Sequence, residues 1–160
     1  MKAEYKFAYE VYDSIDDLKE EDVLLLKHAI SATKNAYAPY SNFHVSAFAR
    51  LANGEMVSGT NQENASYPVG MCAERSLLAT AATLHHGVVI KTMAITYNNI
   101  NGKSKHPISP CGMCRQVLSE YEARVQHPIR IILAGMEGKV YLIESASMLL
   151  PLSFTSGDMK

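Results

Sequence analysis

Cysteines are scarce in this chain of 160 residues: there are three, an odd number. The opening stretch, MKAEYKFAYEVYDSID, also lacks the apolar run and the small-residue cleavage site of a secretory leader. A disulfide framework needs paired cysteines and an oxidising compartment. We therefore expect a cytoplasmic protein whose cysteines are free thiols or metal ligands.

The chain also lacks an excess of charge and any long apolar run. Its formal net charge is -1, whereas nucleic-acid binders usually carry a basic excess or a basic face. No stretch reaches the roughly 18 consecutive apolar residues of a membrane-spanning helix. We expect neither a nucleic acid nor a membrane as a partner, and a composition of 48% hydrophobic and 19% charged residues is that of a globular protein.

Internal repeats, low-complexity tracts and linkers are absent as well. The sequence therefore predicts one domain over residues 1–160. Within it, residues 1–13 are either an N-terminal arm or an extra strand, since Tyr5, Phe7, Tyr9 and Val11 alternate with polar neighbours.

Hydrophobic periodicity predicts an α/β fold. Helical spacing of three and four alternates along the chain with segments of strand character, and Asn53-Gly54 marks a hairpin turn. Helices between strands cover both faces of a sheet, while hairpins make that sheet mixed. We expect a three-layer α/β/α fold with a mixed five-stranded sheet. Its helices are predicted at 16–37, 72–86, 111–125 and 145–150, and its strands lie in 42–61, 88–98, 129–135 and 139–145.

The three cysteines have the spacing of a metal site. Cys111 and Cys114 are three positions apart at the predicted start of a helix, and Cys72 lies at the start of an earlier one. Helix N-termini favour thiolates, and three thiolates suit zinc. No fourth protein ligand is evident beside them, and a catalytic zinc keeps an open position for water.

An acidic and a basic residue follow the first cysteine in the sequence. Glu74 is two residues beyond Cys72, where a carboxylate can take a proton from a zinc-bound water and pass it on. Arg75 is positioned to hydrogen-bond a ligand sulfur and offset the negative charge of three thiolates. A structural cysteine needs neither neighbour.

The cysteines alone leave two other interpretations open. Cys111 and Cys114 could form a thioredoxin-like redox pair, although such a pair needs neither Cys72 nor Glu74. A histidine could instead close a structural zinc site with the three cysteines. The candidate histidines are His44, His85, His86, His106 and His127, none with tight ligand spacing to a cysteine.

Four ordered blocks decide between these interpretations. YAPYSNFHV, NQENASYPVGMCAER, SPCGMCRQVL and LLPLSF together resemble the small zinc-dependent cytidine deaminases of pyrimidine salvage, over roughly residues 20 to 155. The resemblance implies hydrolytic deamination of cytidine and 2′-deoxycytidine to uridine and 2′-deoxyuridine. It also implies one zinc per subunit and a homotetramer with shared active sites.

Residue by residue, the resemblance assigns zinc binding to Cys72, Cys111 and Cys114, and proton transfer to Glu74. For the substrate, it implies that Phe43 packs on the base, that Asn61 and Glu63 bind the ribose hydroxyls, and that the backbone of Ala73 and Ser109 contacts the base and its amine. For the assembly, it implies that Phe154 reaches the base pocket of a neighbouring subunit and that Tyr67 lies near a subunit contact.

Three positions depart from the pattern of the family. Ser46 and Phe48 stand where a glycine and a small or aliphatic residue are common, and Gln62 replaces a valine or isoleucine. The loop 98–107 and the N-terminal arm also look longer than the family minimum. Rival functions are a same-fold aminohydrolase on another substrate, such as a blasticidin-type nucleoside, and a non-catalytic zinc-stabilised scaffold, which would not need Glu74.

Overall fold

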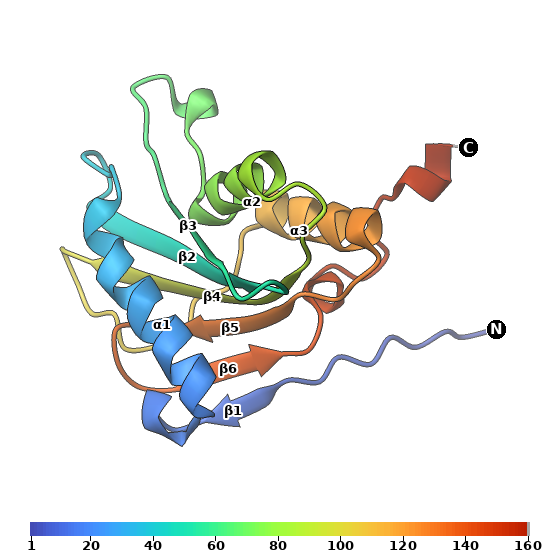
Figure 1. Cartoon of the computed structure of the whole chain (residues 1–160), viewed down its shortest axis with the longest axis horizontal. Coiled ribbons are helices and arrows are strands. Elements are labelled where there is room, and N and C mark those ends of the chain that lie inside the picture. Colours follow the sequence, from blue (N-terminus) through green and yellow to red (C-terminus); the bar gives the residue numbers. More distant parts are fainter. Residues whose placement is uncertain (160) are drawn as a thin grey trace.

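The computed structural model describes residues 1–159 and shows one mixed sheet between two helical layers (Figure 1). The strand order is β1-β6-β5-β4-β2-β3, in which β4 and β5 are parallel and all other neighbours are antiparallel. The elements are β1 (Glu10–Tyr12), α1 (Glu20–Ala32), β2 (Phe43–Leu51), β3 (Met56–Thr60), α2 (Ala73–Leu84), β4 (Ile90–Asn99), α3 (Gly112–Val125), β5 (Arg130–Ala134) and β6 (Val140–Ile143). The α/β class and the three layers predicted from the sequence are confirmed.

Both faces of the central strands are covered, so β4 and β5 are apolar on both sides. Met93, Ile95 and Ile131 belong to the core beneath α2 and α3, whereas Ala94 and Ile132 belong to the core beneath α1. Successive strand residues face opposite sides of a sheet, and this alternation lets one strand serve two cores. Among residues 1–159, no helix has both the length and the apolar character needed to cross a bilayer.

The sheet has six strands, so the predicted number of five was wrong by one. The additional strand is β1, which pairs antiparallel with β6 at the edge of the sheet. Only three residues of the N-terminal segment make this pairing, and their side chains are largely exposed. Of the two alternatives that the sequence left open for residues 1–13, an arm or an extra strand, the structure shows a strand over these three residues.

Two helices differ in length or type from their predicted form. The helix predicted over 16–37 is split into α1 and flanking 3-10 turns at Ile15–Asp17 and Thr33–Asn35. Pro39 lies beyond the second turn, where it cannot continue a helix. The predicted last helix is a 3-10 helix over Ala146–Leu149.

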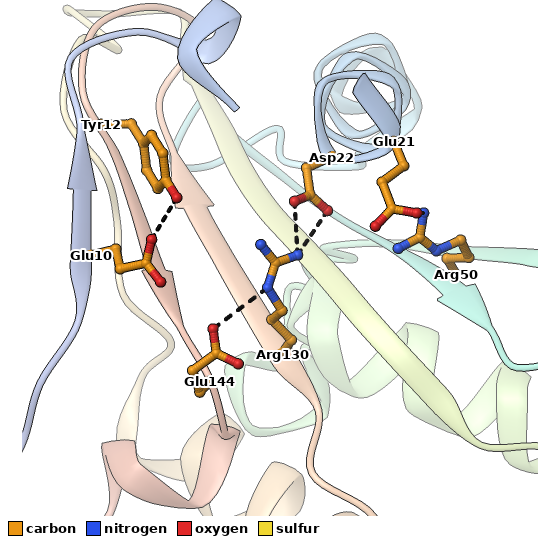
Figure 2. Close-up of polar contacts among 7 residues, drawn as sticks. All are labelled: Glu10, Tyr12, Glu21, Asp22, Arg50, Arg130 and Glu144. Atoms are coloured by element: carbon orange, nitrogen blue, oxygen red, sulfur yellow. Dashed lines mark hydrogen bonds and ion pairs between the residues drawn. The ribbon is translucent and has the colours of Figure 1, made fainter. Parts of the chain in front are cut away.

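Charged pairs fix α1 on the sheet (Figure 2). Asp22 in the first turn of α1 is fully buried, and its carboxylate pairs with the guanidinium of Arg130 from β5 at 2.8 Å. Glu21 pairs with Arg50 of β2 at 2.7 Å. Removing one partner of a buried pair leaves an uncompensated charge, so the Asp22–Arg130 pair constrains where α1 can dock.

Ser46, which departs from the family pattern, is buried, and its unpaired hydroxyl costs folding free energy. Its side chain is fully buried in β2, and its hydroxyl has no hydrogen-bond partner among the described residues. Phe48, the second departure, stacks on His28 of α1 at 5.2 Å, on the sheet face opposite α2 and α3. Both departures therefore affect packing.

We expect Ser46→Ala to stabilise the protein, because a buried unpaired hydroxyl costs about 1–3 kcal/mol. The expected gain in unfolding free energy is about 1 kcal/mol, measured by urea denaturation at fixed protein concentration. Ser58→Ala, at an exposed position of β3, is the matched control and should change stability by less than about 0.5 kcal/mol. A loss of stability in Ser46→Ala would show that the hydroxyl has a partner.

Candidate metal centre and substrate cavity

Two helix N-termini meet at the cysteines. Cys72 is the N-cap of α2 and Cys111 the N-cap of α3, and their carbonyls accept the backbone N–H groups of Ser76 and Arg115. Cys114 follows one turn later on α3 and is buried. The positive ends of both helix dipoles therefore face the same three sulfurs.

The sulfur separations fit a single zinc ion. Cys72 Sγ and Cys111 Sγ are 4.0 Å apart, Cys111 Sγ and Cys114 Sγ are 3.6 Å apart, and all three atoms lie within 4.8 Å of one another. Three sulfurs at about 2.3 Å from one tetrahedral ion would be about 3.8 Å apart. Among residues 1–159, no histidine or carboxylate joins this group, so the three sulfurs would leave a fourth position open.

The protein environment already favours a thiolate in this group. Hydrogen bonding from Cys114 lowers the pKa of Cys72 to about 6, although burial and the negative charge of Glu74 oppose this shift. Hydrogen bonding from Cys111 and the positive charge of Arg75 act in the lowering direction. The Cys72 thiolate in turn raises the pKa of Cys114. Within the described residues Arg75 makes no hydrogen bond to a sulfur, so its effect here is through charge alone.

Glu74 lies in the first turn of α2 and is only 4% exposed. Burial raises the pKa of its carboxyl group above the ordinary value. A carboxyl group whose protonated form is favoured in this way can hold a proton as well as release one. It is therefore suited to repeated proton transfer beside the sulfurs.

A cavity of about 350 Å³ opens in front of the sulfurs. Its volume suits a ligand of nucleoside size. The wall brings together ten of the twelve predicted site residues. These are Phe43, Asn61, Glu63, Tyr67, Cys72, Ala73, Glu74, Ser109, Cys111 and Cys114.

Asn61 and Glu63 of the NQE block lie at the rim of the cavity and fix the backbone around it. The side-chain amide of Asn61 accepts the N–H of Val45 at 2.8 Å and donates to the carbonyl of Phe43 at 2.9 Å. The Glu63 carboxylate accepts the N–H of Tyr40 at 2.9 Å and the hydroxyl of Ser41. The Ser41 hydroxyl lowers the pKa of Glu63 and the Tyr40 N–H adds to this shift, which exceeds the opposing effect of burial, so Glu63 is an anion at the rim.

Gln62, between these two residues, also lines the cavity. Its side chain is exposed and donates to the hydroxyl of Thr60 at 3.0 Å. Its backbone pairs with Met71 in both directions at 2.9 Å, directly before Cys72. This pairing ties the polar rim to the segment that presents the first cysteine.

Two of the predicted site residues lie outside this cavity. Phe154 is 60% exposed on the C-terminal segment, where its carbonyl accepts a hydrogen bond from Gln116. Arg75 acts on Cys72 without lining the cavity. Tyr67 does line it, but at the rim and 77% exposed.

The site predicted from the sequence did not include three apolar residues that line the cavity. Val45, Met71 and Ile108 line it along with the predicted residues. Val45 is two positions from Phe43 on the same strand, so strand alternation was a sufficient signal for it. Ile108 precedes Ser109 in a loop, where no periodicity indicates which way a side chain faces.

Comparisons with known proteins agree with this geometry. Residues 19–127 match the family model described as the cytidine and deoxycytidylate deaminase zinc-binding region. A cytidine deaminase of Halalkalibacterium halodurans is 36% identical over 136 residues, which is 85% of this chain and 96% of that protein. The chain belongs to the cytidine deaminase family. It is therefore an enzyme of the hydrolase class, as the motifs predicted.

Structural similarity supports the assignment to the cytidine deaminase family. The crystal structure of a cytidine deaminase from Burkholderia pseudomallei superposes with a TM-score of 0.72 at 35% identity, covering 86% of this chain and all of that one. A blasticidin-S deaminase of Bacillus cereus is also similar, at 27% identity over 87% of this chain and 96% of that protein. Sequence similarity therefore extends to a deaminase named for another substrate.

Proposed function

We propose that this member of the cytidine deaminase family catalyses the zinc-dependent hydrolysis of cytidine and 2′-deoxycytidine to uridine and 2′-deoxyuridine, with release of ammonia. The single observation that carries the proposal is the buried Glu74 beside three converging sulfurs at the end of a nucleoside-sized cavity. The proposed setting is pyrimidine salvage in the cytoplasm.

Cys72, Cys111 and Cys114 would hold one zinc per subunit. When bound, zinc would polarise a water molecule and lower its pKa, supplying the nucleophile for C4 of the pyrimidine. Arg75 would offset part of the negative charge of the three thiolates. The helix N-termini that carry Cys72 and Cys111 would act in the same direction.

Glu74 would carry the protons of the reaction. One proton goes from its carboxyl group to ring N3 as water adds to C4, and a later one goes to the amine nitrogen before ammonia leaves. Addition of water and loss of ammonia balance the conversion of cytidine to uridine. The backbone of Ala73 and the carbonyl of Ser109, which both line the cavity, would orient the base and its amine.

Phe43 would pack on the face of the base, while Asn61 and Glu63 would bind the ribose hydroxyls. Each of these two polar side chains already fixes the backbone at the start of β2, and each retains acceptor capacity for a hydroxyl. The sugar site would therefore be held in place before a substrate enters, which lowers the cost of binding.

The substrate range tests this proposal. Ammonia release should be fast with cytidine and 2′-deoxycytidine and slow with blasticidin S, because Asn61 and Glu63 match a ribose. Faster turnover of blasticidin S than of cytidine would favour the second candidate, a deaminase of that type. That candidate is supported by the similarity to the Bacillus cereus protein.

We expect Glu63→Gln to raise KM for cytidine about tenfold, with a smaller change in kcat. The amide is a poorer acceptor than the carboxylate, and hydrogen bonds to charged groups contribute about 1.5–3 kcal/mol. Steady-state kinetics on the zinc-loaded protein measure this. Glu55→Gln, which alters an exposed carboxylate at the β2–β3 hairpin, is the control. An unchanged KM in Glu63→Gln would remove Glu63 from the sugar site.

We also propose a homotetramer in which Phe154 reaches the cavity of a neighbouring subunit. Its 60% exposure in one chain and the exposed Leu152 beside it support this assignment, because large exposed apolar side chains that gather on a segment often mark an interface. Light scattering should give four times the 17.6 kDa chain mass. A monomer with full activity would contradict a shared site.

A further inference from the structure

The aromatic wall of the cavity has a second ring behind it. Phe43 of β2 stacks on Tyr97 of β4, with ring centroids 4.8 Å apart and planes inclined by 17°. The register of the two strands pairs Val45 with Tyr97 and Phe43 with Asn99, so Phe43 and Tyr97 are diagonal neighbours on one face of the sheet. Tyr97 is 1% exposed, so its ring is confined by packing.

The hydroxyl end of Tyr97 is held from the opposite side. It lies 3.2 Å from Nδ1 of His106, and the two rings meet edge to face with centroids 5.7 Å apart. His106 belongs to the loop between β4 and α3, and Ile108 and Ser109 of the cavity wall follow two and three residues later in the same loop. Tyr97 is thus enclosed between the cavity wall and this loop.

The loop itself is fixed to the core. The Ser104 hydroxyl accepts the N–H of Asn99 at 2.8 Å, and the Ser104 carbonyl accepts the N–H of Met136 at 2.7 Å. A Cβ atom added at Gly135 would lie 2.3 Å from the Ser104 carbonyl oxygen, so this backbone contact requires glycine. The position of His106 is therefore set by tight backbone packing.

We infer that Tyr97 and His106 are positioning residues that fix the plane of the Phe43 ring against the pyrimidine base. This inference rests on the proposed function, in which Phe43 packs on the base. His106 holds the Tyr97 hydroxyl, Tyr97 holds the face of Phe43, and Phe43 presents its other face to the cavity. The loop 98–107 thereby supports base binding without touching the substrate.

Kinetics of paired variants test the inference. Tyr97→Phe keeps the ring and removes the hydroxyl, whereas His106→Ala keeps both rings of the stack. Either should raise KM for cytidine about threefold to tenfold, the range expected for one hydrogen bond, with kcat and zinc content unchanged. The double variant should be no worse than either single variant, because both remove the same contact.

Two further variants separate positioning from general stability. His106→Asn places an amide within reach of the Tyr97 hydroxyl and should restore most of the KM. His127→Ala, at an exposed histidine beyond α3, is the control and should leave KM unchanged. A variant that melts at lower temperature with wild-type KM would indicate a purely structural contact and overturn the inference.

A readout independent of turnover keeps this inference separate from the proposed function. The chain has four phenylalanines, so the ring signals of Phe43 can be assigned in an NMR spectrum by comparison with Phe43→Leu. His106→Ala should shift or broaden the Phe43 signals although the Tyr97 ring remains. Unchanged Phe43 signals would contradict the inference, whereas a wild-type protein inactive on cytidine would contradict only the proposed function.

Discussion

Glu74→Gln should lower kcat for cytidine by about 10²- to 10⁴-fold while the protein remains folded and loaded with zinc. The amide has nearly the same size as the carboxyl group, so it fits the buried position, but it cannot accept and return a proton. General acid–base catalysis by one positioned group contributes roughly this factor. Uridine formation, followed by absorbance or chromatography, gives the rate.

The control for this variant is Glu120→Gln, at an exposed position on α3. It should leave kcat and KM unchanged, which shows that removal of one negative charge does not itself slow the reaction. Zinc content and melting temperature should match the wild type in both variants. Turnover within about threefold of wild type in a zinc-loaded Glu74→Gln protein would exclude Glu74 as the proton carrier.

Gly59→Ala should strongly destabilise the fold. Gly59 lies on β3 where the strand crosses the start of α2, and an added Cβ would be 2.4 Å from the Ala73 carbonyl oxygen and 2.3 Å from the Leu77 nitrogen. Both are backbone atoms, so no side-chain rotation relieves the contact. We expect a loss of about 3 kcal/mol in unfolding free energy.

The same substitution should also weaken zinc binding. Cys72 caps the helix that would be pushed away, so its sulfur would move relative to Cys111 and Cys114. Zinc competition with a colorimetric chelator should show at least a tenfold lower affinity, in line with loss of ligand orientation. Gly112→Ala is the matched control, because Gly112 lies between two of the cysteines and an added Cβ there meets nothing within 4 Å. Wild-type melting and zinc affinity in Gly59→Ala would contradict this account.

The convergence of the three sulfurs could be predicted because it depends on local rules. A cysteine at a helix N-cap and another one turn later share a side of the helix, so Cys111 and Cys114 are neighbours in any such fold. The approach of Cys72 required the additional assumption that two helix starts meet. The structure places the three sulfurs within 4.8 Å of one another.

Contacts set by strand register could not be predicted from the sequence. The stack of Phe43 on Tyr97 depends on β2 pairing with β4 in one particular alignment, across 53 intervening residues. The close approach at Gly59 depends on how α2 crosses β3, which neither segment specifies alone. The sequence left an arm or an extra strand open for residues 1–13, because the pairing of β1 depends on its partner β6 and covers only three residues.

The most direct test of the central claim measures uridine formation from cytidine and zinc content on the same purified sample. We predict turnover with about one zinc per chain, loss of turnover after the zinc is removed by a chelator, and recovery on adding one equivalent back. A protein with one zinc per chain that forms no uridine from cytidine would contradict the account and favour another amine substrate or a zinc-stabilised scaffold.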